Sequence, residues 1–435
     1  MKSTKNLILY KNFENGKLFY NMAWIMENYE NEYYNREDIE ALLYECFNQL
    51  SELAVSHGFK GNLWHNFIAF ILVNNENAYS RGCEIRGGME GSVNQIALHD
   101  FKIMKDLFDF DFTELAKDYE IDCMDALLHY ESAGDSGKLF NKRIRDRICE
   151  LTVKLEQAAD AGDFKDAVTE FYGEFGVGKL GLHKAFRVLH KEDGAQIVPI
   201  TNIAHVKLDD LVGYEIAKQK LIDNTESFVR GKEANNCLLY GDAGTGKSTS
   251  IKAIANQYYD RGLRLIEVYK HQFCDLNDVI AQIKNRNYKF IIYMDDLSFE
   301  EFEIEYKYLL KGYDFAGKKG LEKKPDNVLI YATSNRRHLI RETFSDKEEV
   351  REDMHTSDTV QEKLSLYARF GVSIYFGAPG KKEFQHIVVS LAEKNGITMD
   401  EETLLAEANK WELAHGGLSG RTAQQFINYL LGKQE

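Results

Sequence analysis

A short glycine-rich segment constrains the fold of this chain more than any other feature. Residues 241–248 read Gly-Asp-Ala-Gly-Thr-Gly-Lys-Ser, between an apolar run at 237–240 and a helical pattern that begins near Ile251. Small residues in such a turn let backbone N–H groups surround a phosphate, and the lysine and serine supply a positive charge and a metal ligand. The N-terminus of the following helix favours anions. The spacing therefore predicts a nucleotide-phosphate site on a strand–turn–helix unit.

We expect this loop to hold the phosphates of ATP. Lys247 is predicted to reach the β and γ oxygens, and the Ser248 hydroxyl is predicted to ligate Mg²⁺. The residues expected to line the bound phosphates are Gly241, Asp242, Ala243, Gly244, Thr245, Gly246, Lys247, Ser248 and Thr249.

Two carboxylates follow a second apolar run, at residues 289–294. Asp295 is suited to hold a water of the magnesium shell, and Asp296 is suited to polarise the water that attacks the γ-phosphate. A nearby acid, Glu300, is the alternative activator of that water. The pair predicts hydrolysis in addition to binding.

Three further polar residues are candidates for the same site. Asn335 ends the apolar run 328–333 and is predicted to orient the attacking water. Arg369 ends a helical pattern before the last strand, where it is predicted to reach a neighbouring subunit's γ-phosphate; the alternative is a surface arginine paired with acids of residues 346–362. Arg421 follows Ser419, an expected helix N-cap, and is predicted to lean onto the phosphates.

The apolar pattern divides the chain into three predicted domains. Residues 35–175 read mainly as helices, because apolar side chains recur at three- and four-residue spacing. Short apolar strands then alternate with helices, which predicts a parallel α/β sheet. The expected strands are 237–240, 263–268, 290–294, 328–333 and 372–376, and the expected domains are 1–195 (helical, partner-binding), 196–379 (nucleotide-binding) and 380–435 (a helical lid).

Composition excludes several classes of protein. The six cysteines form no C-x-x-C pair, which argues against a zinc cluster and a disulfide scaffold. The longest apolar run, 67–73, is too short for a membrane helix, so we expect a cytoplasmic protein with no membrane partner. A net charge of −15 repels nucleic acid, which we therefore do not expect as a partner.

Taken together, residues 208–435 resemble an ATPase module of the AAA+ superfamily. Within it, the strings LDDLVGYE, YGDAGTGKS, DDLSFE, YATSNRRHLI and EKLSLYARFG are similar to the bacterial domain-of-unknown-function family 815, and EGSVNQIALHDF at 90–101 extends the similarity. The resemblance implies strand order 5-1-4-3-2, a lid beyond Pro379, and Val212 and Gly213 near the adenine. It also implies a homo-oligomer with shared ATP sites, in which Arg369 acts in trans.

Two departures from the superfamily pattern matter for function. Asp296 stands where these enzymes usually carry glutamate. Tyr269 and Phe273 follow the second strand, yet Lys270 and His271 between them do not resemble an aromatic threading loop, which argues against protein unfolding by translocation.

Three functions fit these features. The first is an Mg-ATP-hydrolysing ATPase that remodels an unknown protein client held by residues 1–195. The second is a slowly hydrolysing, nucleotide-gated switch. The third is a loader acting on nucleic acid, whose local support is a basic cluster of Arg336, Arg337, His338 and Arg341.

Overall fold

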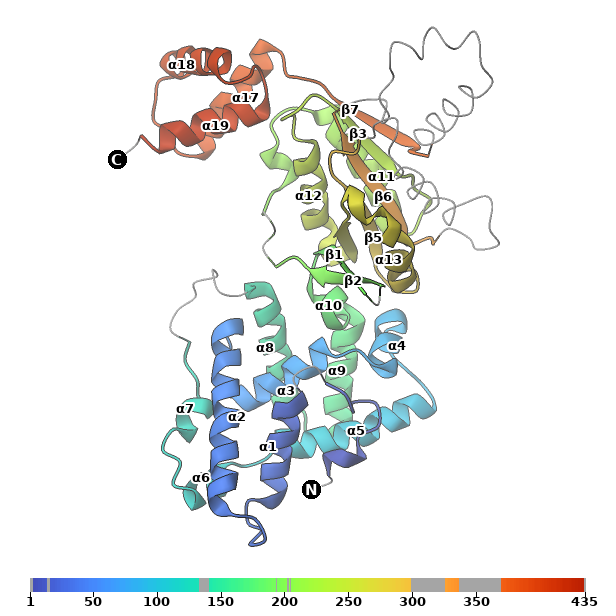
Figure 1. Cartoon of the computed structure of the whole chain (residues 1–435), viewed down its shortest axis with the longest axis vertical. Coiled ribbons are helices and arrows are strands. Elements are labelled where there is room, and N and C mark those ends of the chain that lie inside the picture. The colour runs from blue at the N-terminus through green and yellow to red at the C-terminus, as the bar shows by residue number, and fades with distance from the viewer. Residues whose placement is uncertain are drawn as a thin grey trace. The chain divides into compact units, whose positions relative to one another are not determined.

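The computed structural model describes residues 3–13, 16–132, 141–192, 194–201, 203, 205–298, 325–335 and 369–433. The chain divides into two compact units, Met1–Leu182 and His183–Glu435 (Figure 1). The apolar pattern predicts an N-terminal domain that extends to residue 195. Residues 185–191 instead belong to the second unit, because they form a strand that hydrogen-bonds to its sheet.

The N-terminal unit is helical, as the spacing of its apolar residues predicts. Asparagine and aspartate side chains begin several of its helices by accepting hydrogen bonds from first-turn N–H groups, as Asn62 and Asp160 do. The helices are α1 (Gly16–Asn28), α2 (Arg36–His57), α3 (Leu63–Asn74), α4 (Ala78–Arg86), α5 (Ser92–Phe108), α6 (Thr113–Asp118), α7 (Met124–Leu128), α8 (Lys142–Glu156), α9 (Ala161–Phe175) and α10 (Gly178–Leu182), preceded by a 3₁₀ turn, η1 (Thr4–Asn6).

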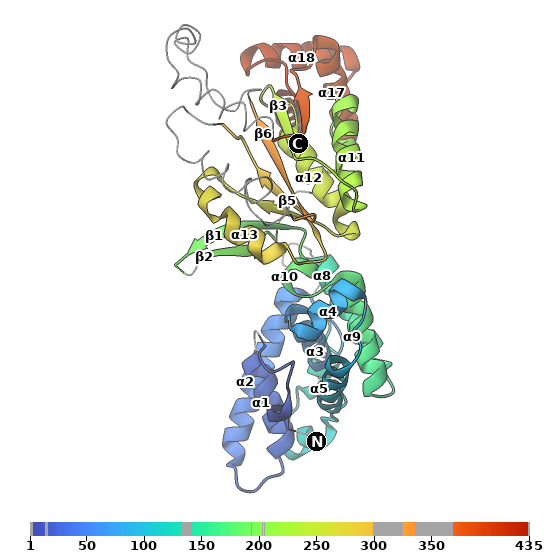
Figure 2. The same ribbon diagram turned by 90° about the vertical axis from the view of Figure 1, so that its right-hand side faces the viewer.

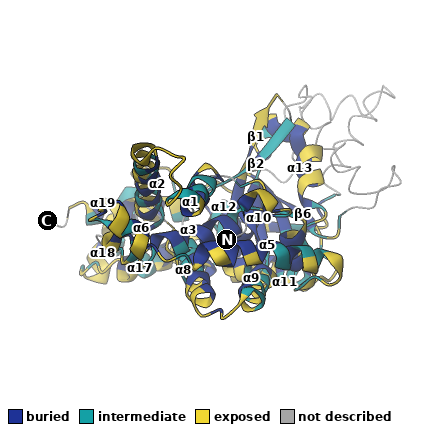
Figure 3. Cartoon of the chain, turned by 90° about the horizontal axis from the view of Figure 1, so that it is seen from below, coloured by how far each residue is buried: buried dark blue, intermediate teal, exposed yellow. Residues whose placement is uncertain are grey.

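Helix α3 forms the centre of this unit. It contains the longest apolar run of the sequence, and its residues from Phe67 to Val73 are all buried. Helices such as α9 instead bury one side and expose the other (Figure 3). A helix that is apolar all round requires neighbours on every side, so α3 is a core helix and not a membrane span. No helix among the described residues is long and apolar enough to cross a membrane.

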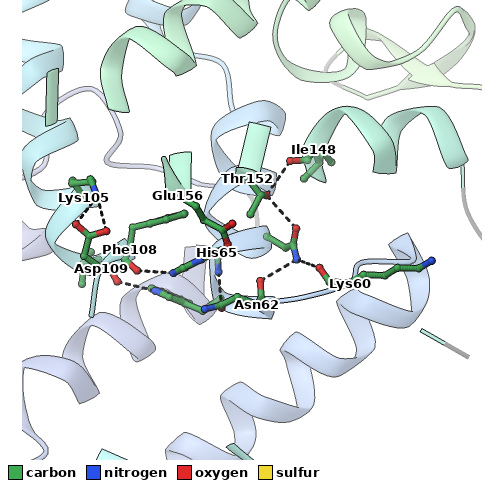
Figure 4. Close-up of polar contacts among 12 residues, drawn as sticks. Lys60, Asn62, His65, Lys105, Phe108, Asp109, Ile148, Thr152 and Glu156 are labelled. Atoms are coloured by element: carbon green, nitrogen blue, oxygen red, sulfur yellow. Dashed lines mark hydrogen bonds and ion pairs between the residues drawn. The ribbon is translucent and has the colours of Figure 1, made fainter. Parts of the chain in front are cut away.

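Polar contacts fasten α3 to its neighbours (Figure 4). His65 contacts the Glu156 carboxylate of α8 through Nδ1 at 2.8 Å and the Phe108 carbonyl of α5 through Nε2 at 2.9 Å. Thr152 of α8 donates to the Asn66 side chain of α3 at 3.1 Å. The same unit holds its first residues through the buried Asp100 carboxylate, which accepts the backbone N–H groups of residues 8–10.

The second unit is built on a seven-stranded sheet in the order β2-β1-β4-β5-β6-β3-β7. Six of these strands pair in parallel, and the five from β3 to β7, numbered along the chain, follow the expected order 5-1-4-3-2. The strands are β1 (Ala185–Lys191), β2 (Gly194–Pro199), β3 (Cys237–Gly241), β4 (Leu263–Glu267), β5 (Lys289–Met294), β6 (Val328–Ser334) and β7 (Val372–Phe376). The predicted α/β fold class is confirmed.

Two strands extend the sheet beyond the predicted five. β1 pairs in parallel with β4, and β2 closes an antiparallel hairpin onto β1. Four of the seven residues of β1 are exposed, including all three after Val188. Strands at a sheet edge lack the continuous apolar run of central parallel strands, which is why this pair escaped prediction.

Helices α11 (Glu215–Val229) and α12 (Lys247–Tyr258) share one core with the sheet (Figure 2). Leu221, Phe228, Ile251 and Ile254 of these helices pack with alternate residues of the central strands. Helix α13 (Leu276–Ile283) packs against β2. Three 3₁₀ turns complete the connections: η2 (Leu208–Asp210), η3 (Tyr259–Arg261) and η4 (Lys270–Asp275).

The C-terminal residues form the expected helical lid. Helices α17 (Lys381–Lys394), α18 (Glu401–Ala414) and α19 (Gly420–Leu431) bury a separate apolar core that includes Phe384, Leu404 and Phe426. Val212, from the segment before α11, also packs on this core. The lid is therefore a small module with its own core, and it also contacts the segment that precedes α11.

Candidate nucleotide-binding site

The glycine-rich loop leaves β3 and enters α12, as the sequence predicts. Gly241, Gly244 and Gly246 have φ of 136°, 76° and 92°, in the region that glycine adopts without strain. A Cβ on Gly241 would lie 2.1 Å from the Phe376 carbonyl oxygen, and one on Gly246 would lie 2.3 Å from Leu211 Cδ1. Glycine is thus required by both backbone conformation and close packing.

Hydrogen bonds shape the loop before α12 begins. The Thr245 hydroxyl donates to the Asp242 carbonyl at 2.8 Å, and Ala378 N–H donates to the Asp242 carboxylate at 2.7 Å. The Lys247 ammonium donates to the carbonyls of Gly241 and Asp242 at 2.9 and 2.6 Å. Burial lowers the pKa of Lys247, although the neighbouring carboxylates oppose that shift. Ala243 is exposed at the loop tip, and Ser248 and Thr249 are partly exposed on the first turn of α12.

A continuous chain of hydrogen bonds joins this loop to the ends of β5 and β6. Asp295 Oδ1 accepts from the Ser248 hydroxyl at 2.7 Å and from the Thr333 hydroxyl at 2.6 Å. Asn335 Nδ2 donates to Asp296 Oδ1 at 2.8 Å, and Lys247 Nζ donates to Asn335 Oδ1 at 3.2 Å. The structure therefore brings together five residues that the sequence placed in one site and adds Thr333 as their common support.

The Asp295 carboxylate is stabilised in its charged form. It faces solvent on one side and protein on the other, and its partial burial by itself raises the pKa. The hydroxyl groups of Thr333, Tyr293 and Ser248 around the carboxylate outweigh burial and hold the pKa of Asp295 below its usual value. The group is therefore an anion at neutral pH, as a metal site requires.

Asp296 has an unusual backbone. Its φ of 49° lies in the left-handed region, and its N–H donates to the Thr333 hydroxyl at 2.9 Å. Aspartate tolerates this region better than most residues with a Cβ. The backbone turn sends Asp295 toward Ser248 and Asp296 toward Asn335, so two adjacent carboxylates serve different partners.

Tyr293 is a site residue that the sequence analysis missed. It precedes Asp295 by two positions on β5, is 1% exposed, and carries a hydroxyl that forms no hydrogen bond of normal geometry with the described residues. Ser248, Asp295 and Thr333 nevertheless lie near enough to influence its pKa, which burial raises. A polar hydroxyl within the apolar run 290–294 was the available signal.

The lid reaches the phosphate loop directly. Ser419 caps α19 by accepting from Thr422 N–H at 3.1 Å, and Arg421 N–H donates to the Gly244 carbonyl at 3.2 Å. This contact is made by the backbone of Arg421, so the predicted contact of its side chain with the phosphates stays a prediction. A second contact of the lid is made with η2, through an ion pair between Lys394 of α17 and Asp210. The hydrogen bond from Lys394 lowers the pKa of Asp210.

The residues expected near adenine lie on the same connection. Val212 contacts the lid core, and Gly213 follows with φ of 81°. Tyr214, also left-handed at φ 61°, donates its hydroxyl hydrogen to the Gly377 carbonyl at 3.0 Å. This segment therefore runs between the lid and the end of β7.

Arg369 does not join the other site residues. It precedes β7, whose first residue, Val372, pairs with Cys237 at the start of β3, whereas the phosphate loop follows the opposite end of β3. Four strand steps separate these ends by about 13 Å, in addition to the residues beyond each end. Glu300, Arg336, Arg337, His338 and Arg341 lie outside the described residues.

The oxygen atoms of Ser248 and Asp295 fit a magnesium ion. Both are hard ligands, and they meet beside the loop where phosphate oxygens would complete the shell. Magnesium retains several waters and needs few protein ligands. Among the described residues no cluster of three or more His, Cys, Asp or Glu side chains offers an all-protein metal cage.

Comparison with known proteins gives one long match and several local ones. Residues 181–434 match the family model described as protein of unknown function DUF815. A replication factor C large subunit of Staphylothermus marinus is 36% identical over 74 residues, which is 17% of this chain and 17% of that protein. The corresponding subunit of Methanococcus vannielii is 43% identical over 76 residues, 18% of this chain and 15% of that protein.

Solved structures with similarity to the chain include two of Thermotoga maritima RuvB. A mutant form has a TM-score of 0.37 and 15% identity, and the similarity covers 52% of this chain and 64% of that one. The structure titled as the RuvB Holliday junction branch migration motor has a TM-score of 0.32 and 15% identity, covering 52% and 72%. The strand order, glycine-rich loop, acid pair and lid described above, together with the family match, establish the relationship: this chain belongs to the DUF815 family, and its second unit is an AAA+ domain.

Proposed function

We propose that this protein is an ATPase that binds and hydrolyses Mg-ATP to remodel or regulate a macromolecular partner held by its N-terminal unit. One observation carries the proposal: hydrogen bonds link Lys247, Asn335 and Asp296 on one side, and Ser248, Thr333 and Asp295 on the other, at the edge of one sheet. These are the groups needed to bind phosphate, hold a metal and orient a water.

Each residue has a defined role in this proposal. Lys247 exchanges the loop carbonyls for the β and γ oxygens of the substrate, and the loop N–H groups surround the β-phosphate. Ser248 and Asp295 hold Mg²⁺, which would supply charge neutralisation at the phosphates. Asp296 polarises the attacking water, and Asn335 keeps that carboxylate oriented. Val212 and Gly213 lie against the adenine.

The ATPase proposal is tested by phosphate release from purified full-length protein. Lys247→Ala should lower kcat/KM by about 100-fold or more, because it removes a preorganised positive charge. Asp296→Asn should lower kcat by about 100-fold or more while retaining nucleotide affinity, because it removes the base but no phosphate contact. Lys220→Ala and Asp223→Asn, both exposed on α11, are the matched controls. Equal rates in all five proteins would refute hydrolysis at this site.

A nucleotide-gated switch is the second candidate, favoured by the short carboxylate of Asp296 and its hydrogen bond to Asn335. A shorter base reaches less far, and a switch needs only slow hydrolysis. The rate of hydrolysis in a single turnover, compared with the rate of ADP release, separates the two. ADP release that is faster than hydrolysis by orders of magnitude supports the switch. Hydrolysis that is faster than ADP release supports a remodelling ATPase.

The lid is proposed to couple the nucleotide state to movement. Arg421 begins the helix that contacts the phosphate loop through its own N–H, so a charge change at the phosphates acts directly on α19. Arg421→Ala should weaken the preference for ATP over ADP, as measured by equilibrium binding of both nucleotides. An unchanged preference would remove Arg421 from this role.

A homo-oligomer with shared sites is also part of the proposal. Arg369 lies toward the opposite strand ends from its own phosphate loop, so it is a candidate to serve the site of a neighbouring copy. Mixing Arg369→Ala subunits with Asp296→Asn subunits tests this, because shared sites would include some in which both residues are intact. Absence of any regained hydrolysis in the mixture would count against sharing.

The N-terminal unit is proposed to hold the partner, which we would seek in the bacterial cytoplasm. Tyr33, in the turn between α1 and α2, is 96% exposed, and large exposed aromatics are common at contact surfaces. Co-purification with Asp296→Asn protein, expected to remain in the ATP state, is the search experiment. A client retained equally by Lys247→Ala protein would not depend on that state.

Nucleic acid remains a possible partner that requires its own test. The net charge of −15 disfavours it, but the local similarity is to proteins named as replication factor subunits. Retention on single- and double-stranded DNA should therefore be measured over a range of salt concentrations. Retention that falls steeply with salt would support a loader, and none at low salt would exclude it.

A further inference from the structure

Two buried tyrosines lie side by side on the face of the sheet that α11 and α12 cover. Tyr293 of β5 and Tyr331 of β6 are register partners, and both belong to the core shared with those helices. They are 1% and 0% exposed. Both rings are therefore buried in one core, and the two residues differ in what surrounds their hydroxyl groups.

The Tyr331 hydroxyl has hydrogen-bond partners, and the Tyr293 hydroxyl has none among the described residues. Tyr331 Oη accepts from Asn224 Nδ2 and shares a hydrogen bond with the Thr225 hydroxyl, each at 2.9 Å. Tyr293 Oη forms no such bond with the described residues. A buried hydroxyl without a partner is destabilising, so its presence calls for a specific explanation.

The surroundings of Tyr293 supply that explanation. Tyr293 is the second-last residue of β5, and Asp295 follows it by two positions, just after the strand ends. Ser248, Asp295 and Thr333 are the polar residues around its buried hydroxyl, and a phenol O–H is a hydrogen-bond donor. The hydrogen bonds from Ser248 and Thr333 both end on Oδ1 of Asp295. The acceptor available to the Tyr293 O–H is therefore the Asp295 carboxylate.

We propose that Tyr293 is a positioning residue for the magnesium site: its buried hydroxyl donates to the Asp295 carboxylate when Mg²⁺ is bound beside Ser248. The inference rests on the proposed function, since it assigns a supporting residue to that metal site. Hydrogen bonds to metal-holding carboxylates fix their orientation, and their loss commonly weakens metal binding by about 10–100-fold. A hydroxyl kept for this purpose has no partner in the described part of the metal-free chain.

Tyr293→Phe and Tyr331→Phe form a matched pair, because each removes one buried hydroxyl from the same face of the sheet. In the full-length chain, binding of a fluorescent ATP analogue is measured while Mg²⁺ is titrated, and then again in excess chelator. Tyr293→Phe should raise the Mg²⁺ concentration at half-effect by about 10–100-fold and leave metal-free nucleotide affinity unchanged. Tyr331→Phe should leave both values unchanged.

Thermal unfolding without nucleotide gives the opposite ranking. Tyr331→Phe should lower the midpoint by about 2–4 °C, because it breaks satisfied hydrogen bonds with Asn224 and Thr225. Tyr293→Phe should keep or raise the midpoint, because it removes an unpaired group. Excess Mg²⁺ should restore phosphate release by Tyr293→Phe, which it could not do if the residue were merely structural.

Two results would overturn the assignment. If wild-type binding depends on Mg²⁺ and Tyr293→Phe shows the same dependence, Tyr293 does not position the site, although the ATPase proposal stands. If both variants weaken Mg²⁺ binding equally and both melt early, the effect belongs to the sheet and not to the hydroxyl. Wild-type protein with no Mg²⁺-dependent nucleotide binding would refute the proposed function and this inference with it.

Discussion

Asp296 shows how one residue's backbone sets the chemistry of the site. At φ 49° its peptide turns sharply after β5, and its N–H bonds to Thr333. Glutamate pays a larger conformational penalty in this region than aspartate does. The shorter acid, which departs from the superfamily pattern, is therefore compatible with the turn that separates the two carboxylates.

His57, at the C-terminus of α2, gives a prediction for pH. Its ring packs on Phe59 and Phe70, and this burial lowers the pKa from 6.5 even though Nδ1 donates to the Leu53 carbonyl. The unfolded chain therefore binds the proton first as the pH falls. We expect the N-terminal unit to lose stability below about pH 6.5, by at most about 1.4 kcal/mol per pH unit.

Urea unfolding at pH 7.5 and 5.5 measures this loss, followed by tryptophan fluorescence because Trp24 and Trp64 lie in this unit. His57→Gln should reduce the difference between the two pH values. His129→Gln, which removes an exposed histidine, is the control and should retain it. An identical difference in wild-type and His57→Gln protein would show that other groups govern the pH dependence.

At the scale of elements, the loop between β3 and α12 depends on glycine for two separable reasons. Gly241 and Gly262 both have positive φ, at 136° and 87°. A Cβ on Gly241 would meet the Phe376 carbonyl oxygen of β7, whereas one on Gly262 would meet nothing within 4 Å. Backbone strain is thus common to both positions, and the steric clash belongs to Gly241 alone.

We predict that Gly262→Ala lowers the free energy of unfolding by about 1–2 kcal/mol, the cost of the backbone conformation. Gly241→Ala should lower it by at least about 3 kcal/mol, because two strands must also separate. It should lose nucleotide affinity as well. Equilibrium unfolding of both variants checks the ranking, and equal losses would mean that β7 moves aside at little cost.

At the scale of the whole molecule, the chain is two units with separate cores. The apolar cluster around α3 and those around α12 and the lid share no residues. Ligand binding stabilises only what unfolds together with its site. We therefore predict that Mg-ADP at about 100 times its Kd stabilises the second unit by about 2.7 kcal/mol and leaves the first unchanged.

Hydrogen exchange, measured peptide by peptide, tests this independence. Amides of β3, β5 and α12 should exchange more slowly with nucleotide present, and amides of α2, α3 and α5 should not change. Lys247→Ala is the control and should show no slowing at the same nucleotide concentration. Slowing in α3 to the same extent as in β5 would mean that the two units unfold as one.

Much of the second unit was predictable because its signals are local. Each central strand is a continuous apolar run, and its polar end residues, Asp295 and Asn335 among them, follow at once in sequence. Strands β1 and β2 were missed because β1 joins the sheet through hydrogen bonds to β4, which is distant in sequence, and β2 joins it only through β1. The Tyr293 hydroxyl, which has no hydrogen-bond partner among the described residues, was missed because the sequence does not show which side chains surround a buried group.

The sequence by itself determined the glycine-rich loop, the acid pair and the helical lid, because each follows from residue chemistry or from apolar spacing along the chain. The order of the five central strands came from the family resemblance and not from spacing. Tertiary structure alone decided that Thr333 bonds to both aspartates, that the Arg421 N–H meets the Gly244 carbonyl, and that Arg369 lies toward the far end of the strands. Those contacts depend on the register of strands and helices that are remote in sequence, and side-chain pattern does not encode register directly.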